Sequence, residues 1–312
     1  MPLHIETPTI EASWGRSETQ SRTFLKLECL QPPGSFKIRG IGALCEHHFK
    51  LGKKKFVSSS GGNAGMAAAY AGEHLSLPVI VVVPESTTSR AIDLLKSYNA
   101  DVIVHGPSWA EADAYARSLL DDEVAYIHPF DDPLLWTGYA SMIDEVANSG
   151  LQPDRIILSV GGGGLLSGVL EGIERNEWDN CKVVAVETAG ADSLAHSMVE
   201  SRIIELDAID SIASSLGAKR VSARAYSLAK KHNVESAVVS DLLAVKACRR
   251  FLDDHRMLVE PACGAALAWA YASSSCTSVY QSDLVIVCGG ATATIEHLLA
   301  WEVELSSAST SV

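Results

Sequence analysis

The sequence predicts an α/β protein with two domains, each built on a twisted, mainly parallel sheet flanked by helices. Short apolar segments alternate with helical stretches along almost all of the 312 residues, which is typical of strand–helix–strand units. About nine strands are expected, which is more than one compact sheet usually holds, so a second sheet is indicated. These strands cover residues 23–27, 56–58, 78–83, 102–104, 124–127, 155–160, 183–187, 237–239 and 284–287.

Composition and charge exclude several classes of function. The chain has 47% hydrophobic and 20% charged residues, which is ordinary for a soluble globular protein. Its net charge of −13 argues against nucleic acid or an anionic membrane as a partner, because phosphate binding needs clustered Lys and Arg. No apolar run approaches the roughly 20 residues that span a bilayer, and the N-terminus lacks the basic and apolar regions of a signal peptide. We therefore expect a cytoplasmic protein with a small-molecule ligand.

The first informative stretch places a lysine at a predicted helix start. Two prolines and a glycine before Ser35 make a turn, and this turn leaves Phe36 and Lys37 in the first turn of a helix expected over residues 36–49. A protonated ammonium is poorly placed there, because the helix N-terminus already carries partial positive charge. Lys37 is therefore either an ordinary solvated lysine or a group kept for chemistry or for an anion.

The second stretch, residues 58–70, follows a predicted strand and opens a helix. Its small residues let the backbone approach a ligand, and Ser60 and Asn63 can cap the helix. Exposed backbone N–H groups at such a helix start form a site for a carboxylate or a phosphate. A capped helix that packs closely through its alanines explains the same residues equally well.

The third stretch is a run of glycines between the predicted strand 155–160 and a helix. Glycine weakens ordered structure by up to about 1 kcal/mol relative to alanine, and a tight turn needs one or two glycines. Successive free N–H groups at this place bind phosphate, whereas the sequence patterns of NAD-binding and ATP-binding loops are lacking. The run and the residue after it are Gly161, Gly162, Gly163, Gly164 and Leu165.

A lysine at a helix start, an Asn-containing loop and a phosphate-binding loop together suggest pyridoxal 5′-phosphate. Its aldehyde bonds covalently to a lysine, its phosphate needs backbone donors, and its ring accepts electrons from a carbanion. The segments Ser35-Phe-Lys-Ile-Arg-Gly40, Ser60-Gly-Gly-Asn-Ala-Gly65 and Gly161-Gly-Gly-Gly-Leu165 resemble the motifs of the fold type II (tryptophan synthase β-like) pyridoxal-phosphate enzymes. The resemblance is closest to the L-serine/L-threonine dehydratases, and order and spacing agree across nearly the whole chain.

The resemblance implies a domain division and a role for each motif. Residues 31–133 would form a small domain with the lysine and the Asn loop, and residues 1–30 and 134–312 a large cofactor-binding domain. Lys37 would be the catalytic Schiff-base lysine, Phe36 would pack against the pyridine ring, and Asn63 would hydrogen-bond the phenolic oxygen of the cofactor. The phosphate would be held by Gly161, Gly162, Gly163, Gly164 and Leu165. The substrate would be bound by Ser60, Gly61, Asn63 and Ala64.

The resemblance also assigns a thiol to the pyridine nitrogen. Cys288 ends the predicted strand 284–287, and in this family a Ser or Cys there leaves the ring nitrogen largely unprotonated. A less electrophilic ring suits elimination and disfavours transamination. A cysteine used as a small core residue is the structural alternative.

A monovalent cation, K⁺ or another, is implied as a second bound group. The side chain of Glu187 and the carbonyls of Ala191, Leu216 and Ala218 would hold it, in keeping with the preference of hard cations for oxygen ligands. The alternative for Glu187 is a carboxylate at a strand end that faces water.

The reaction implied by the resemblance is elimination of water from L-serine or L-threonine, followed by hydrolysis of the product to pyruvate or 2-oxobutanoate and ammonia. Two other reactions use the same motifs, β-replacement as in cysteine synthases and racemisation as in serine racemases. The family's racemases have a serine acid/base group at the position of Gly61, which cannot carry a proton, and the cysteine synthases have a different Asn loop. A non-catalytic pyridoxal-phosphate-binding regulatory protein is the alternative from another class, against which Lys37 and Cys288 argue.

A homodimer is expected from the family, and the preferred amino acid stays open.

Overall fold

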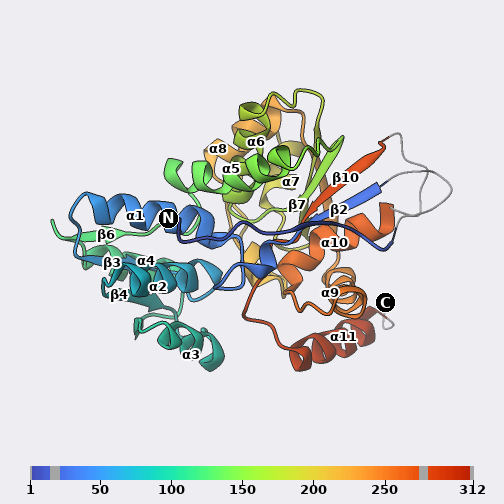
Figure 1. Cartoon of the computed structure of the whole chain (residues 1–312). Helices are drawn as coiled ribbons and strands as arrows, with labels where there is room; N and C mark the ends of the chain where they lie inside the picture. Colours follow the sequence, from blue (N-terminus) through green and yellow to red (C-terminus); the bar gives the residue numbers. More distant parts are fainter. Residues whose placement is uncertain (1, 15–21, 274–279, 310–312) are drawn as a thin grey trace. The chain divides into compact units, whose positions relative to one another are not determined.

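The computed structural model describes residues 2–14, 22–273 and 280–309 (Figure 1). The chain divides into two compact units. The first consists of Met1–Ile5 and Gln31–Tyr139, and the second of Glu6–Leu30 and Ala140–Val312. In the part of the chain that is described, no helix is both long enough and apolar enough to cross a membrane.

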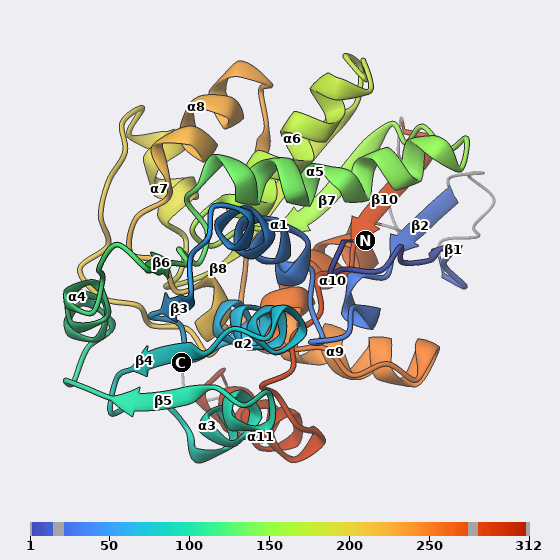
Figure 2. The same cartoon turned by 60° about the vertical axis from the view of Figure 1, so that its left-hand side comes forward.

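The first unit contains a four-stranded parallel sheet with the strand order β5-β4-β3-β6. Its strands are β3 (Lys55–Ser58), β4 (Val79–Val83), β5 (Asp101–Val104) and β6 (Val124–Tyr126), and its helices are α1 (Lys37–Lys50), α2 (Asn63–Leu75), α3 (Ser89–Ser97) and α4 (Trp109–Ser118). Strands β4 and β5 lie side by side and run in the same direction (Figure 2). Val57 and Val82 form a core with Ala112 and Ala116 of α4, because branched strand side chains fit closely against small helix residues.

The second unit contains a six-stranded sheet with the order β1-β2-β10-β7-β8-β9, in which only the pairing of β1 with β2 is antiparallel among the described strands. Its strands are β1 (Thr9–Glu11), β2 (Arg22–Lys26), β7 (Arg155–Ser159), β8 (Lys182–Thr188), β9 (Glu235–Val239) and β10 (Ser282–Ile286). Its helices are α6 (Gly164–Arg175), α7 (Ser193–Val199), α8 (Ala223–Lys231), α9 (Asp241–His255), α10 (Pro261–Ser273) and α11 (Ile295–Ser309), with short 3-10 turns at Glu28–Leu30 (η1) and Ser214–Leu216 (η2). Helix α5 (Pro133–Asn148) begins in the first unit and ends in the second. Strands β7 and β8 are almost entirely buried, and the middle of each is continuously apolar, at residues 156–158 and 183–186.

The α/β fold class is confirmed, and each expected strand is present within about two residues of its predicted limits. Strand β1 was not expected. It is three residues long and contains a threonine and a glutamate, so it has neither the length nor the apolar pattern of a buried strand. It adds to the edge of the sheet through antiparallel pairing with β2, which is a tertiary contact that its own sequence does not indicate.

The first unit extends beyond the expected range of 31–133 at both ends. Ile5 exchanges two hydrogen bonds with the Gln31 side chain, at 3.0 and 2.9 Å, so the N-terminal five residues group with this unit rather than with the large one. At the other end, the first turns of α5 pack against α1. A Cβ on Gly138 would lie 2.5 Å from the carbonyl oxygen of Arg39, so the two backbones are in direct contact.

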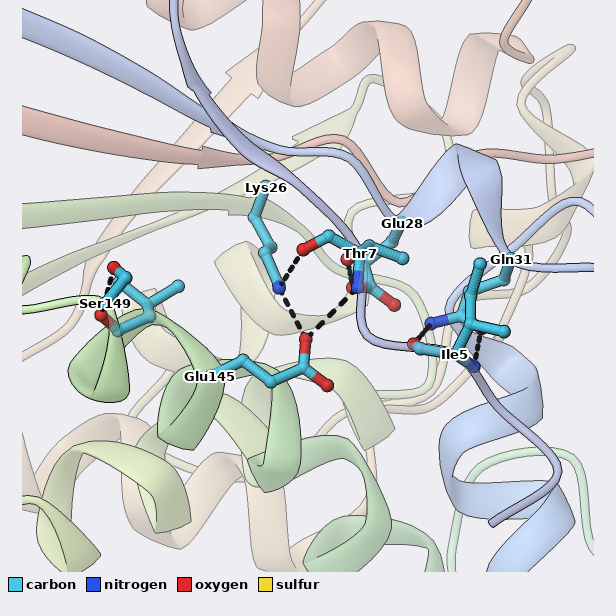
Figure 3. A network of polar contacts seen from close by, with 8 residues as sticks. Ile5, Thr7, Lys26, Glu28, Gln31, Glu145 and Ser149 are labelled. Carbon is cyan, nitrogen blue, oxygen red and sulfur yellow. Dashed lines mark hydrogen bonds and ion pairs between the residues drawn. The ribbon is translucent and has the colours of Figure 1, made fainter. Parts of the chain in front are cut away.

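A buried ion pair joins β2 to α5 inside the second unit (Figure 3). Lys26 is only 1% exposed, and its Nζ donates to Glu145 Oε2 at 2.5 Å and to the carbonyl oxygen of Thr7 at 2.7 Å. The Thr7 hydroxyl donates to Glu28 Oε1 at 2.6 Å. Removing an ammonium from water costs several kcal/mol, so Lys26 can be buried here only because these acceptors surround it.

Candidate active site

Lys37 is the first residue of α1, as the sequence predicts, and its amine is held by a backbone carbonyl. The turn before it closes with a hydrogen bond from Gly34 N–H to the Gln31 carbonyl at 2.7 Å, and Gly34 has a φ of +82° that favours glycine. The half-buried Lys37 side chain donates from Nζ to the carbonyl oxygen of Pro129 at 2.7 Å. Its Nζ also lies 5.2 Å from the centre of the Phe36 ring. The amine therefore has a defined position within its own unit.

Phe36 is supported from behind by Tyr139. The two ring centres are 4.9 Å apart with 58° between the planes, and the fully buried Tyr139 lies directly against α1. Gly40 makes this approach possible, since a Cβ there would lie 2.7 Å from Cε1 of Tyr139. Tyr139 thereby fixes the position of the Phe36 ring. The packing of that ring against a pyridine ring stays a prediction.

The Asn loop joins β3 to α2, and the helix begins at Asn63 with Gly62 as its N-cap. No side chain caps α2 through a hydrogen bond. Ser60 does not cap the helix in the expected way, because its Oγ accepts the N–H of Gly62 at 3.3 Å, one residue before the helix. The N-cap residue itself, Gly62, brings no side chain to the first turn, where the partial positive charge of the helix favours an anion.

Two glycines of this loop are required by close contacts. A Cβ on Gly65 would lie 1.8 Å from the carbonyl oxygen of Ser60, so the loop folds directly over the first turn of α2. A Cβ on Gly61 would lie 2.9 Å from Cγ2 of Thr87 and 3.2 Å from Cγ1 of Val83. At residue 61 the loop therefore has room for the backbone and little room for a side chain.

The glycine run joins β7 to α6 in the second unit. A Cβ on Gly161 would lie 2.8 Å from Cα and 3.0 Å from the carbonyl oxygen of Leu216. Gly163 has a φ of +89°, and its Cβ would lie 2.3 Å from Cβ of Ala225. No side chain caps α6 and its first turn holds no acidic residue, so an anion can use its N-terminus. These contacts require glycine at residues 161 and 163, and the phosphate of pyridoxal phosphate fits the start of α6, where the N-cap Gly163 brings no side chain.

Cys288 follows β10 and is buried next to a second thiol. Its segment is fixed by the N–H of Val287, which donates to the Lys26 carbonyl at 3.0 Å, and by the N–H of Cys29, which donates to the Val287 carbonyl at 3.0 Å. A hydrogen bond with Cys263 of α10 and burial together raise the pKa of the Cys288 thiol well above its ordinary value. The thiol is therefore neutral, as the prediction of an uncharged partner for a ring nitrogen requires, and its contact with that ring stays a prediction.

Glu187 does not face water, so the solvated alternative for this residue is wrong. It is fully buried at the end of β8, where Oε1 accepts the N–H of Leu194 at 2.9 Å and Oε2 the N–H of Ala195 at 2.7 Å. Burial raises the pKa of the Glu187 carboxyl to about 8 despite these two donors. Within the described residues, no cationic side chain pairs with it.

The proposed carbonyl ligands of the cation lie in turns of the same unit. The N–H of Ala191 donates to the Thr188 carbonyl at 2.9 Å, and the N–H of Ala218 donates to the Leu216 carbonyl at 2.7 Å. Across the described residues, no group of three or more His, Cys, Asp or Glu side chains could hold a metal ion. A site built from one carboxylate and carbonyls is of a different kind, and cation binding stays a prediction.

The sequence does not mark Pro129 as the partner of Lys37, because a backbone carbonyl has no residue-type signal. The topology supplies the missing link. Strands β3 and β6 pair in parallel, so the segments that follow them, the Asn loop and residues 127–131, leave the sheet at the same edge. A proline shortly after the end of a strand, here β6, is the signal that could have located this segment.

A polar network that the sequence does not reveal connects these two segments. Ser59 Oγ donates to Asp113 Oδ1 at 2.6 Å, the Tyr126 hydroxyl donates to the same oxygen, and Arg117 Nε donates to Asp113 Oδ2 at 2.8 Å. Burial acts to raise the pKa of the Asp113 carboxyl, but the three hydrogen bonds outweigh it and hold the pKa below its ordinary value. The ionised carboxylate thereby ties the end of β3 to the end of β6.

Comparison with known proteins assigns the family. Residues 1–289 match the family described as pyridoxal-phosphate dependent enzymes, and the chain belongs to that family. It is therefore an enzyme that uses pyridoxal 5′-phosphate, and the predicted cofactor and fold type II architecture are confirmed.

Relatives in this family are similar over nearly the full length. A mouse protein named serine dehydratase-like is 44% identical over 315 residues, which cover 97% of this chain and 95% of the mouse protein. Human L-serine dehydratase/L-threonine deaminase is 42% identical over 315 residues, which cover 97% of this chain and 96% of the human protein. The crystal structure of a fungal L-serine ammonia-lyase from Rhizomucor miehei matches with a TM-score of 0.91 at 34% identity, covering 96% of this chain and 98% of that one. The resemblance expected from the motifs is confirmed.

Proposed function

We propose that the chain is an L-serine/L-threonine ammonia-lyase. It removes water from the amino acid, and the product hydrolyses to pyruvate or 2-oxobutanoate and ammonia. The full-length similarity to proteins named for this activity supports the proposal. The single structural observation that carries it is the close packing of Thr87 against Gly61, which leaves the Asn loop without room for a second acid/base side chain.

Lys37 is the group that moves the proton. Pyridoxal 5′-phosphate, when bound, supplies an electron sink for the charge left at the substrate Cα. The Nζ of Lys37 takes the Cα proton, and the Pro129 carbonyl gives this amine a defined position whenever it is not bonded to the cofactor. Because a carbonyl accepts a hydrogen bond from an amine and from an ammonium, it serves Lys37 before and after the transfer.

Each unit supplies its own residues to the proposal. In the first unit, Lys37 would bond covalently to the cofactor, Phe36 would pack against its ring, and Asn63 would donate to its phenolic oxygen. Its phosphate is bound by backbone N–H groups of residues 161–165, with the uncapped N-terminus of α6 favouring the negative charge. Neutral Cys288 would lie at the ring nitrogen and leave it largely unprotonated, which suits elimination and disfavours transamination.

The substrate carboxylate is bound at the start of α2. The residues for this role are Ser60, Gly61, Asn63 and Ala64. The first turn of a helix carries a partial positive charge, and the N-cap Gly62 brings no side chain to it, so a carboxylate is favoured there over a neutral group. Selection between serine and threonine depends on one methyl group, which is worth only about 1–3 kcal/mol.

A bound cation, the location of the enzyme and its assembly are further parts of the proposal. A monovalent cation such as K⁺ binds at Glu187 with carbonyls of Ala191, Leu216 and Ala218. The buried carboxylate, with a pKa raised to about 8, supports this because a cation would compensate its charge. The protein acts in the cytoplasm on free amino acids and forms a homodimer, as the composition and the family indicate.

Product analysis tests the proposed reaction. Purified protein with pyridoxal phosphate should release keto acid and ammonia in equal amounts from L-serine or L-threonine. Formation of D-serine, or of cysteine from an activated serine and sulfide, as the main product would replace the proposal by racemisation or β-replacement. An absence of ammonia from a broad set of amino acids would favour a regulatory protein.

A further inference from the structure

The Pro129 carbonyl that holds the Lys37 amine belongs to a turn built by a histidine side chain. Nδ1 of His128 accepts the backbone N–H of Phe130 at 3.2 Å and that of Asp131 at 2.8 Å. A ring nitrogen that accepts two donors must have its lone pair free, so its proton lies on Nε2 and the imidazole is neutral. The side chain thereby closes the chain around Pro129.

Pro129 cannot hold this turn together by itself. Proline has no backbone N–H, and its ring is buried in the unit. A further contact comes from Trp136, whose Nε1 donates to the Phe130 carbonyl at 3.2 Å. The direction of the Pro129 carbonyl, and with it the position of the Lys37 Nζ at 2.7 Å, therefore depends on the acceptor in His128.

The surroundings of His128 keep its ring neutral. Burial lowers the pKa of His128, and the positive charges of Arg117 and Lys37 act in the same direction, whereas Asp131 and Asp113 oppose it. The rings of Phe130 and Tyr126 lie edge-on to the imidazole, with ring centres 4.9 and 6.0 Å away. The charged groups that face the ring are thus Asp131 in its own turn, Asp113 and Arg117 on α4, and Lys37 on α1.

We propose that His128 is a positioning residue for Lys37, and that its neutral imidazole shapes the turn that presents the Pro129 carbonyl to the Lys37 amine. The role assigned to Lys37 rests on the proposed function, whereas the turn itself rests on the contacts of His128. Protonation of the imidazole would remove the acceptor of two N–H groups and place a second positive charge near the amine. Acidic conditions should therefore disturb Lys37 through His128.

Substitutions that separate the acceptor from the titrating ring test the proposal. His128→Asn keeps an oxygen that can accept the N–H groups two and three residues on, as Asn does in turns, and it cannot be protonated. His128→Ala removes the acceptor. His105→Asn is the matched control, because His105 is exposed, lies in the same unit and stacks on Tyr115. Each variant is assayed for kcat and KM across pH, for the rate at which cofactor-free protein forms the visible absorption band, and for secondary structure.

The variants should differ in a defined order. We expect His128→Ala to lower kcat and the rate of cofactor attachment about ten- to a hundredfold, with a smaller change in KM, because a displaced Lys37 affects proton transfer and bonding to the aldehyde. His128→Asn should stay within about threefold of the wild type and lose the part of the acid decline that lies below the ordinary histidine pKa of about 6.5. His105→Asn should match the wild type in kcat, in the rate of cofactor attachment and in the acid decline.

Two outcomes would overturn the proposal. Wild-type cofactor attachment in folded His128→Ala would show that the turn does not need the imidazole. An unchanged acid decline in His128→Asn would show that another group titrates, and this comparison decides the question even if His128→Ala does not fold. Cofactor attachment is measured without any amino acid, so a failure of the proposed lyase reaction would leave this test intact.

Discussion

Thr87 fills the space into which a side chain at Gly61 would project. A Cβ on Gly61 would lie 2.9 Å from Cγ2 of Thr87 and 3.2 Å from Oγ1 of Thr87. The two residues, 26 positions apart in the sequence, are therefore complementary in shape. The lack of an acid/base group at residue 61 is therefore a property of the packing as well as of the sequence. A single substitution cannot add such a group without moving Thr87.

Gly61→Ser should destabilise the protein by about 1–2 kcal/mol, because an added side chain overpacks this contact. Thr87→Ala in the same chain should recover most of the loss, since it removes the crowding atoms. The free energy of unfolding of both single variants and the double variant gives the coupling between the positions. Gly62→Ala is the control, because the nearest heavy atom to its Cβ would be Ser60 Oγ at 4.0 Å. Additive effects of the two substitutions would contradict the packing argument.

Lys37→Ala should lose both the visible absorption of the bound cofactor and the release of ammonia, because it removes the amine that the Pro129 carbonyl holds and that would bond to the cofactor. Lys50→Ala is a matched control at the exposed end of the same helix and should keep both. Absorption spectroscopy and an ammonia assay measure the two properties separately. Retention of either property in Lys37→Ala would exclude Lys37 as the residue bonded to the cofactor.

The parts of the fold and site that the sequence predicts are those with a local signal. Apolar runs identify the buried strands, and glycine runs identify loops such as residues 161–164, where Gly163 adopts a positive φ. The partners of these residues have no local signal. Lys37 is held by a carbonyl 92 residues away, and Lys26 is neutralised by Glu145 119 residues away, which only the folded chain brings together. Glu187 illustrates the same limit, since nothing near it in the sequence indicates that it caps α7.

Lys26→Met should lower the free energy of unfolding by about 3–5 kcal/mol, because Glu145 would be left partly buried without its cation. Lys26→Met combined with Glu145→Leu should regain most of that loss. Arg175→Ala, which breaks a more exposed pair with Asp144, should cost no more than about 1 kcal/mol. Chemical denaturation measures the free energy of unfolding of Lys26→Met, of the double variant and of Arg175→Ala. Equal costs for Lys26→Met and Arg175→Ala would show that burial of the first pair does not matter.

Gly163→Ala should weaken both the fold and cofactor retention. Gly163 and Gly150 both have a positive φ, +89° and +81°, so alanine strains the backbone in either place. Only Gly163 also lacks space, with Ala225 Cβ 2.3 Å from the added Cβ, whereas nothing lies within 4 Å at Gly150. We expect Gly163→Ala to cost about 1–2 kcal/mol more in unfolding free energy than Gly150→Ala. During dialysis, Gly163→Ala should lose its visible absorption faster, and equal behaviour of the two variants would argue against a phosphate site at this loop.

Glu187 should make the stability of the protein depend on pH. Its pKa is raised from 4.5 to about 8 by burial, so between these values the folded state holds a proton that the unfolded state has released. The free energy of unfolding should therefore fall as pH rises from about 4.5 to about 8, by at most about 1.4 kcal/mol per pH unit for one proton. Glu187→Gln should remove this component of the slope.

A cation bound beside Glu187 would reverse that dependence, because a positive charge favours the ionised carboxylate and lowers its pKa. K⁺ should then stabilise the wild type most at pH 8 and above, and tetramethylammonium at the same ionic strength should not, since it is too large for a site of oxygen ligands. The measurement is the midpoint of thermal unfolding at several pH values in each salt. In Glu187→Gln the difference between the two salts should disappear. An equal effect of both salts on the wild type would show that the buried carboxylate is neutralised by its proton and not by a bound ion.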